Sequence, residues 1–298
     1  MSDDLSGATL AAVTAIVDRA LDEDAPWGDA TSEAAIPASA TATARIVSRV
    51  DGVLAGGLAL ELAFTRVDPT LVVERPLADG DPLAPGAVVA TITGSARSIL
   101  RGERVALNLA QRLSGVATLT RRYVDVVAGS ASASGQPVRL VDTRKTTPGL
   151  RVLEKAAVRA GGGHNHRFSL SDAVMLKDNH LAVLREQGLD LTGAIRAVRA
   201  RIPHTMHLEV EVDRLDQLEA VIAAEPDTID LRTGVALIAG RATVEASGGV
   251  TLDTVRAIAE TGVDVISVGA LTHSAPALDL GLDIVITPGS GGDAGGTR

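Results

Sequence analysis

"MHLEVEVDRLDQLEAVIAAEPDTIDL", residues 206–231, holds one complete unit of the pattern that decides the fold. Two short apolar runs, 206–212 and 227–231, flank a stretch in which apolar residues recur at helical spacing. Apolar, β-branched strands that alternate with amphipathic helices favour a parallel sheet whose faces are covered by helices. The stretch therefore predicts either a barrel or an open doubly wound sheet.

The same alternation continues through the second half of the chain. Six segments are predicted as strands, at 138–143, 172–178, 206–212, 227–231, 242–249 and 263–270. Helical patterns lie between them at 150–160, 191–202, 214–224 and 251–261. The first half differs, with a predicted helix at 5–24, short strands over 42–96, and two helices over 98–128 that break at Ser114-Gly115. The chain thus divides into a small β-rich unit and a larger unit of βα repeats.

The composition narrows the classes of protein to consider. A chain of 298 residues without cysteine has room for a large core but excludes disulfides and thiolate metal sites. No apolar run reaches membrane-spanning length, and the acidic start argues against a secretory signal, so a cytoplasmic protein is expected. A net charge of −9 gives no general reason to bind nucleic acid or an anionic membrane.

One segment reverses this acidic balance. Residues 139–178 hold eight arginines and lysines against four acidic residues, a local charge of +4. The only lysines of the chain, Lys145, Lys155 and Lys177, all lie there. In a chain that otherwise uses arginine, lysine suggests a need for a compact ammonium with a tunable pKa, although three solvated surface lysines remain the alternative.

The densest chemistry lies in "DTRKTTPGLRVLEKAAVRAGGGHNHR", residues 142–167. An Arg144-Lys145 pair precedes a predicted helix, Gly161 is placed to cap that helix in a left-handed conformation, and His166-Arg167 follow the glycines. Guanidinium forks match carboxylates and lysine adds a point charge for phosphate, so this segment predicts a site for a small polyanion. A zinc site built on His-x-His is the competing idea, disfavoured because no suitably spaced cysteine or carboxylate accompanies it.

Polar residues also gather where the predicted strands end. Glu209 and Glu211 alternate along one strand and share a face, which suits either Mg²⁺ or ribose hydroxyls, or the plain polar face of a strand. Two glycine-rich strand ends, 245–250 and 267–274, could cradle a phosphate with backbone N–H groups. In barrels of this type, chemistry sits at the strand ends that carry such residues.

Several motifs together resemble one known family, quinolinate phosphoribosyltransferase. They are "NLAQRLSG", "DTRKTTPGLR", "AVRAGGGHNHR", "DAVMLKDNH", "EVEV", "EASGG" and "SVGALTHS", with "PWGDATSEA" and "RVDGVLAGG" near the start. The resemblance implies an α/β fold with an N-terminal α/β sandwich domain and connecting helices over 1–128, and a C-terminal partial (β/α) barrel over 129–288. Residues 289–298 are expected to form a disordered, glycine-rich tail.

The resemblance also implies an activity. The family joins quinolinate to phosphoribosyl pyrophosphate and releases pyrophosphate and CO₂, giving nicotinate mononucleotide for NAD synthesis. It requires Mg²⁺ and works as a homodimer or larger homo-oligomer, in which one subunit completes its partner's active site.

Residue by residue, the resemblance gives each candidate a role. Those implied for quinolinate are Arg104 from the partner subunit, Arg144, His166, Arg167 and Lys177. Those implied for phosphoribosyl pyrophosphate and its phosphates are Lys145, Glu211, Ser247, Gly248, Gly269 and His273. Catalytic roles are expected for Lys145, Lys177 and Glu211, with Glu211 also a metal ligand.

One departure from the family stands out. The family expects Leu-Asp-Asn, whose Asp helps to hold the metal, where this chain has Leu231-Arg232-Thr233. Only 234–241 remain before the next strand, whereas a parallel crossover normally needs about a dozen residues. Either roughly ten residues are absent from this numbering, or a strained short helix turns Asp230 toward the anion site as a replacement metal ligand.

Two other classes of protein remain to be considered. The segment "ADGDPLAPGAVVATITG" is similar to half of a lipoyl or biotinyl carrier motif, but such a carrier needs a hairpin lysine and none precedes Lys145. The stronger rival is a non-catalytic or re-purposed paralogue that binds a carboxylated or phosphorylated metabolite, which the missing Asp would suit.

Overall fold

The computed structural model describes residues 7–186, 188–231 and 234–288. By its internal contacts the chain forms two units. The first comprises 1–119, 147–162 and 275–298, and the second comprises 120–146 and 163–274. The chain passes from one unit to the other at four points, so the units interleave along the sequence. The predicted boundary between 128 and 129 stays a prediction about independently folding parts, and the predicted tail lies outside the described residues.

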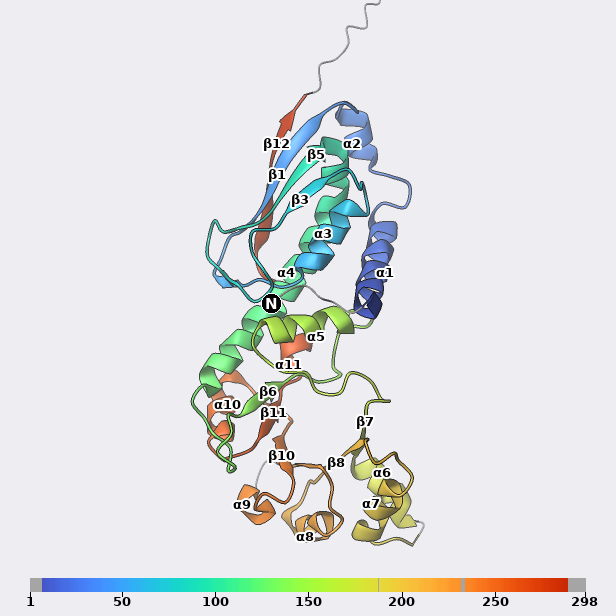
Figure 1. Cartoon of the computed structure of the whole chain (residues 1–298), viewed down its shortest axis with the longest axis vertical. Coiled ribbons are helices and arrows are strands. Elements are labelled where there is room, and N and C mark those ends of the chain that lie inside the picture. Colours follow the sequence, from blue (N-terminus) through green and yellow to red (C-terminus); the bar gives the residue numbers. More distant parts are fainter. Residues whose placement is uncertain (1–6, 187, 232–233, 289–298) are drawn as a thin grey trace, which may run out of the picture. The chain divides into compact units, whose positions relative to one another are not determined.

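The first unit is built on an antiparallel sheet in the order β12-β1-β5-β3 (Figure 1). Its strands are β1 (Thr41–Ser48), β3 (Val72–Glu74), β5 (Val88–Ser95) and β12 (Leu280–Thr287), and a separate pair is formed by β2 (Gly52–Val53) and β4 (Pro82–Leu83). Its helices are α1 (Gly7–Asp24), α2 (Ala30–Ala35), α3 (Gly57–Thr65), the part of α4 (Ala96–Val127) up to residue 119, and α5 (Arg151–Ala160). Residues 42, 44 and 46 of β1 are buried and alternate with exposed ones, as expected when one face of a sheet meets helices.

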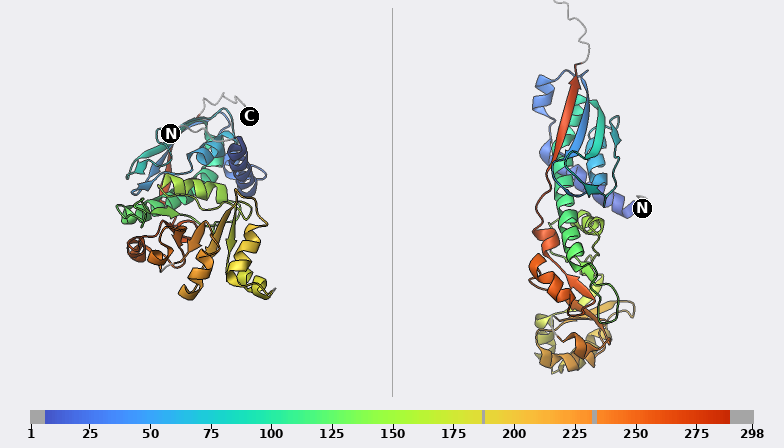
Figure 2. Two further views of the ribbon diagram at one scale, coloured as in Figure 1. Left: turned by 60° about the horizontal axis from the view of Figure 1, so that its bottom comes forward. Right: turned by 90° about the vertical axis from the view of Figure 1, so that its left-hand side faces the viewer.

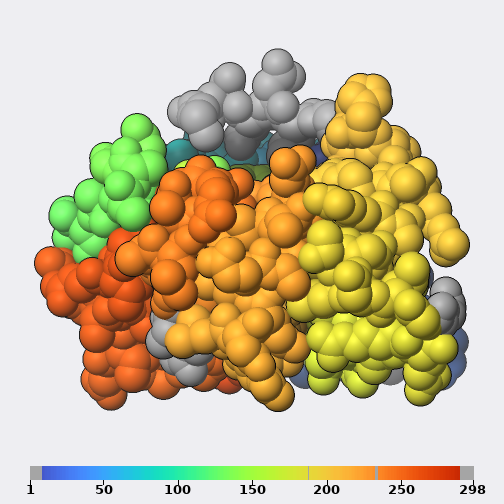
Figure 3. Space-filling view, turned by 90° about the horizontal axis from the view of Figure 1, so that it is seen from below, coloured from blue at the N-terminus to red at the C-terminus, as the bar shows by residue number. Residues whose placement is uncertain are grey.

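The second unit is a six-stranded parallel sheet in the order β6-β11-β10-β9-β8-β7. Its strands are β6 (Arg139–Val141), β7 (Ala173–Leu176), β8 (His207–Glu211), β9 (Thr228–Asp230), β10 (Thr243–Ala246) and β11 (Val265–Ser267). Its helices are α6 (Asp178–Glu186), α7 (Leu191–Arg199), the 3₁₀ turn η1 (Leu215–Gln217), α8 (Leu218–Ile222), α9 (Val235–Ile238), α10 (Leu252–Ala259) and α11 (Ala270–His273). Figure 2 shows the strands of this sheet, and Figure 3 shows the outer face of helices α6 and α7 in yellow and of α8 and α9 in orange. All six predicted strands are confirmed, and so are the α/β class and the partial barrel.

Two predictions about the helices are wrong. The expected break at Ser114-Gly115 does not occur, because α4 is continuous. Ser114 is buried and bonds the backbone of Ala55, and a Cβ on Gly115 would lie 1.9 Å from the carbonyl oxygen of Pro276. These residues therefore serve close packing rather than a turn. Gly161 is right-handed with a φ of −70°, and it is Gly162, one residue later, that is left-handed with a φ of 90°.

The short connection between β9 and β10 contains one short helix, α9, and whether residues are absent from the sequence there stays a prediction. Gly234 precedes the four-residue helix α9 with a φ of 94°, and Ala239 ends it with a φ of 51°. A left-handed conformation is costly for a residue that carries a Cβ. The backbone N–H of Leu231 bonds the carbonyl of Glu245, so the ladder continues past Asp230. The expected departure at 232–233 lies outside the described residues.

Candidate active site

A cavity of 620 Å³ opens at the carboxyl ends of the parallel strands of the second unit. Eleven of the twelve residues predicted for the site line it: Arg144, Lys145, His166, Arg167, Lys177, Glu211, Asp230, Ser247, Gly248, Gly269 and His273. Nine of these residues lie at six different strand ends or in the segments that follow them, because parallel strands bring their carboxyl ends to one edge. His166 and Arg167 lie instead in the segment between α5 and β7, whose His164 pairs with Val141 of β6. The structure thus brings the candidates together, whereas the role of each stays a prediction.

Arg104 is the twelfth predicted residue. It is an exposed residue of α4, in the first unit, and it does not line this cavity. Its expected service to a partner subunit remains a prediction.

Two guanidinium groups, those of Arg144 and Arg167, contribute positive charge to the cavity beside the two lysines. Arg167 donates to the carbonyl of Ala173 (2.9 Å), which fixes its direction. Burial lowers the pKa of Arg167, and the nearby charge of Arg144 lowers it further, against the opposing charges of Glu209 and Asp172. Two cations held close together in a partly buried place favour an anion between them.

Asp142, at the end of β6, anchors the segment that follows the three glycines. Its buried carboxylate accepts from the side chain of Asn165 (2.6 Å) and from the backbone N–H of His166 (2.9 Å). The backbone of His164 pairs in parallel with Val141, so this segment extends the sheet beyond β6. Asp142 therefore sets where His166 enters the cavity.

His166 lies against two buried carboxylates. Its Nε2 is 3.2 Å from Oε2 of Glu209 on β8 and 3.4 Å from Oε2 of Glu245 on β10. Burial by itself would lower the pKa of His166, but the hydrogen bonds and charges of the two glutamates outweigh it and raise the pKa to about 10. The backbone N–H of Arg167 donates to Nδ1 (2.7 Å), so a second ring proton would have to displace that contact.

A row of acidic groups crosses the sheet at one level. Glu211 pairs in register with Asp230, and Asp230 with Glu245. Glu211 is bound by Lys177, and Asp230 accepts from the hydroxyl of Ser247 (2.5 Å). Burial chiefly, together with the three surrounding glutamates and against the hydrogen bond from Ser247, raises the pKa of Asp230 to about 7.

Two threonines hold the backbone of Lys145. Thr143 accepts from its N–H (3.0 Å), and the fully buried Thr272 of α11 donates to its carbonyl (2.8 Å). A Cβ on Gly269 would lie 3.0 Å from Cδ of Lys145 and 3.3 Å from the ring of His273. Because Gly269 has no Cβ, the side chain of Lys145 can pass beside the start of α11.

The loop after β10 is open to the cavity. Gly248 and Gly249 have φ values of 79° and 60°, and a Cβ on either would meet nothing within 4 Å. Thr251 then caps α10, and its N–H and hydroxyl both contact the hydroxyl of Thr254. The loop thus presents backbone close to the cavity with room for a ligand.

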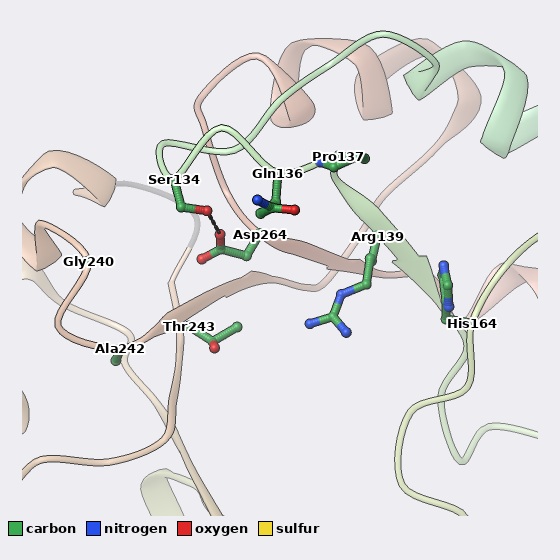
Figure 4. Close-up of a pocket in the computed structure, with 9 residues that line it drawn as sticks. All are labelled: Ser134, Gln136, Pro137, Arg139, His164, Gly240, Ala242, Thr243 and Asp264. Carbon is green, nitrogen blue, oxygen red and sulfur yellow. Dashed lines mark hydrogen bonds between the residues drawn. The ribbon is translucent and has the colours of Figure 1, made fainter.

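A second cavity, of 580 Å³, lies at the amino ends of the same strands (Figure 4). Arg139 and Thr243 begin β6 and β10 there, and Asp264 precedes β11. Asp264 accepts from the N–H of Val244 (2.9 Å) and the hydroxyl of Ser134 (3.4 Å), the latter drawn in Figure 4. None of the twelve predicted residues lines it, but His164 does, so the two histidines of His-Asn-His serve different cavities.

Sequence reasoning missed Glu245 and underrated Glu209. Both carboxylates are almost fully buried, with 4% and 2% of their surface exposed. A charged residue in the middle of an apolar strand is costly to bury unless it is paired. The position of these glutamates within apolar strands could therefore have indicated a paired, buried role. The partner, His166, lies far away in sequence, so the pairing itself could not be predicted.

Comparison with known proteins identifies relatives over nearly the whole chain. The quinolinate phosphoribosyl transferase N-terminal domain matches residues 29–114, and the C-terminal domain matches residues 116–283. A nicotinate-nucleotide pyrophosphorylase (carboxylating) of Mycobacterium leprae is 43% identical over 282 residues, covering 89% of this chain and 95% of that protein. A probable enzyme of the same name from Bacillus subtilis is 40% identical over 273 residues, covering 89% of this chain and 91% of that protein.

Solved structures of the same family superpose on this chain. The crystal structure of NadC from Streptococcus pyogenes superposes with a TM-score of 0.84 at 38% identity, covering 93% of this chain and 98% of that one. Human nicotinic acid phosphoribosyltransferase, at 13% identity and a TM-score of 0.57, shares the fold. No helix among the described residues is both long and apolar enough to cross a membrane. The chain belongs to the quinolinate phosphoribosyltransferase family.

Proposed function

We propose that this protein transfers the phosphoribosyl group of phosphoribosyl pyrophosphate to quinolinate with loss of CO₂, giving nicotinate mononucleotide and pyrophosphate for NAD synthesis. The observation that carries the proposal is the cavity at the carboxyl ends of the sheet, which cations, carboxylates and glycine-rich backbone line together. Relatives at 40% identity and above bear the name of this activity. These residues do not suit a lipoyl or biotinyl carrier, because they line a cavity, whereas a carrier presents its lysine on an exposed hairpin.

Quinolinate is assigned to the guanidinium side of the cavity. Arg144 and Arg167 offer forked donors that match the geometry of a carboxylate. A dicarboxylate placed there would offset the burial and the repulsion from Arg144 that lower the pKa of Arg167. His166 forms part of the wall beside it.

Phosphoribosyl pyrophosphate is assigned to the glycine-rich side. The 247–249 loop and Gly269 offer backbone N–H groups, and Lys145 offers a point charge. As the pyrophosphate departs it gathers negative charge, which cations fixed in advance stabilise. The pyridine nitrogen can then join the anomeric carbon without solvent reorganising between them.

The carboxylates Asp230 and Glu211 fit the Mg²⁺ that the family requires. Both are oxygen ligands on neighbouring strands, and burial together with the neighbouring glutamates raises the pKa of Asp230, so a cation beside it would be favoured. Bound there, Mg²⁺ would neutralise pyrophosphate oxygens. Lys177 holds Glu211 in this structure, so the proposal includes release of Lys177 toward the substrate carboxylates.

Decarboxylation leaves electron density on a ring carbon next to a quaternised nitrogen. Nearby cations stabilise that density, and Arg144, Arg167 and Lys177 all line the cavity. No redox partner is needed, because the electron pair of the broken carbon–carbon bond passes to the ring carbon and is then protonated.

The direct test is turnover. The purified protein, incubated with quinolinate, phosphoribosyl pyrophosphate and Mg²⁺, should release CO₂, pyrophosphate and nicotinate mononucleotide in equal amounts. A re-purposed paralogue would bind one of these substrates and form no nucleotide. Binding without product would therefore replace the proposal by its rival.

The proposal extends to assembly and location. A homodimer or larger homo-oligomer in the cytoplasm is expected, with Arg104 completing a partner's site. Inactive Arg104→Ala and Lys177→Ala variants, when mixed, should then regain part of the activity through hybrid sites. A fully active monomer in light scattering would refute the shared site and leave the chemistry standing.

A further inference from the structure

Four contacts hold His166, one at its backbone and three at its ring. Asp142 holds its backbone N–H, the N–H of Arg167 meets Nδ1, and two carboxylates meet Nε2. A histidine that served only as a mobile charge would not need this many contacts. The ring is therefore fixed rather than merely placed near the cavity.

We propose that Glu209 and Glu245 are positioning residues, which share the Nε2–H of His166 and so fix its ring as one wall of the substrate cavity. They come from β8 and β10, strands that β9 separates, so they approach the ring from two sides. Glu209 does not line the cavity, and it contacts the cavity wall at His166. Neither glutamate is assigned a part in the reaction itself.

The burial of these carboxylates supports a dedicated role. Taking a carboxylate out of water is expensive, and two of them stand here with 2% and 4% of their surface exposed. The Oε1 atom of Glu209 has no hydrogen-bond partner among the described residues. A sheet core filled by apolar residues would avoid that cost, so the pair is retained for what it does to His166.

A metal site is the alternative use of the same atoms. The three ligand atoms of His166, Glu209 and Glu245 lie within 4.8 Å of one another. A neutral imidazole that binds a metal through Nε2 carries its proton on Nδ1. That proton would face the N–H of Arg167, which instead donates to Nδ1. The observed contacts therefore favour a proton on Nε2.

The proposal makes a sharp distinction between two substitutions of Glu245. Glu245→Gln keeps a carbonyl acceptor for Nε2–H, whereas Glu245→Met fills similar space without one. Given the proposed function, the Met variant should raise the KM for quinolinate about 2- to 10-fold, the effect of losing one hydrogen bond while Glu209 still accepts from Nε2–H. The Gln variant should stay close to wild type, and the KM for phosphoribosyl pyrophosphate should change little in either.

Thr228→Val is the matched control. It breaks the hydrogen bond between Nε2 of His207 and the hydroxyl of Thr228 (2.8 Å), which joins β8 and β9 at their amino ends. This variant should lose thermal stability and keep its KM for quinolinate. If it raised that KM as much as Glu245→Met does, the effect would be a general loosening of the sheet, and the positioning role would be wrong.

A measurement without turnover keeps the inference separate from the proposed function. Long-range ¹⁵N–¹H NMR of the wild-type protein, with His166 assigned from a His166→Asn variant, should show a proton on Nε2. A proton on Nδ1 alone would overturn the proposal. So would Zn²⁺ or Mn²⁺ binding at one site per chain in calorimetry that Glu245→Met abolishes, because the cluster would then be a metal site.

Discussion

The two ends of the parallel sheet carry cavities of similar size and very different chemistry. The carboxyl end encloses 620 Å³ and gathers eleven predicted site residues, whereas the amino end encloses 580 Å³ and gathers none of them. Volume therefore does not identify the site. What distinguishes the carboxyl end is that each loop leaving a strand begins there, so separate segments can each contribute one charged or glycine-rich group.

The largest expected difference between the two ends of the sheet is in the effect of removing an arginine on quinolinate binding. Arg167→Ala should weaken quinolinate binding by about 2–5 kcal/mol, because a buried carboxylate loses its forked partner. Arg139→Ala removes an arginine from the amino-end cavity and should leave binding unchanged. Calorimetry with quinolinate measures both, and equal losses in the two variants would break the comparison.

Asp230 should lower the stability of the fold at neutral pH and be needed for turnover. Its pKa is raised from 3.8 to about 7, so the folded state binds a proton more tightly than the unfolded state does. In metal-free buffer the free energy of unfolding should therefore fall by up to about 4 kcal/mol as the pH rises from about 4 to about 7. Asp230→Asn should remove that fall, be more stable than wild type at pH 8, and lose Mg²⁺-dependent turnover. Urea unfolding across this pH range measures it, and an unchanged pH dependence in the Asn variant would contradict the account.

Thr272 should matter through Lys145. Thr272→Val keeps the shape but removes the hydroxyl that holds the Lys145 carbonyl, at a cost of about 1–3 kcal/mol. We expect a lower kcat/KM for phosphoribosyl pyrophosphate that Thr272→Ser largely restores. Ser134→Ala, which removes a hydroxyl at the amino-end cavity, is the control and should leave kcat/KM unchanged. Failure of the Ser variant to restore kcat/KM would assign the loss to packing instead.

The smallest effect should come from the short β9–β10 connection. Ala239 has a φ of 51°, so Ala239→Gly should stabilise the fold by about 1 kcal/mol without changing turnover. Thermal unfolding measures the gain. A loss of stability would mean that the connection is not strained. An intact mass above 30.5 kDa by roughly ten residues would mean that the β9–β10 connection contains further residues.

The strands and the location of the site could be predicted from the sequence, because they depend on local hydrophobic patterns and on the aligned ends of parallel strands. All six strands of the barrel were predictable, because apolar runs between amphipathic helices are local signals. The gathering of Arg144, Lys177 and Asp230 was predictable too, because parallel strands align their ends.

Contacts between distant segments were not predictable in this way. The strand β12, which lies 232 or more residues after its partner β1, pairs with the first sheet although it follows the barrel elements in sequence. Ser114-Gly115 resembled a helix break because its packing partners, Ala55 and Pro276, are remote. The pairing of His166 with Glu209 and Glu245 was hidden for the same reason.

A crystal structure of the protein with quinolinate tests the central claim most directly. The account predicts quinolinate in the carboxyl-end cavity, with its carboxylates against Arg144 and Arg167 and its ring beside His166. Quinolinate bound at the amino-end cavity beside Arg139, with the carboxyl-end cavity empty, would contradict it.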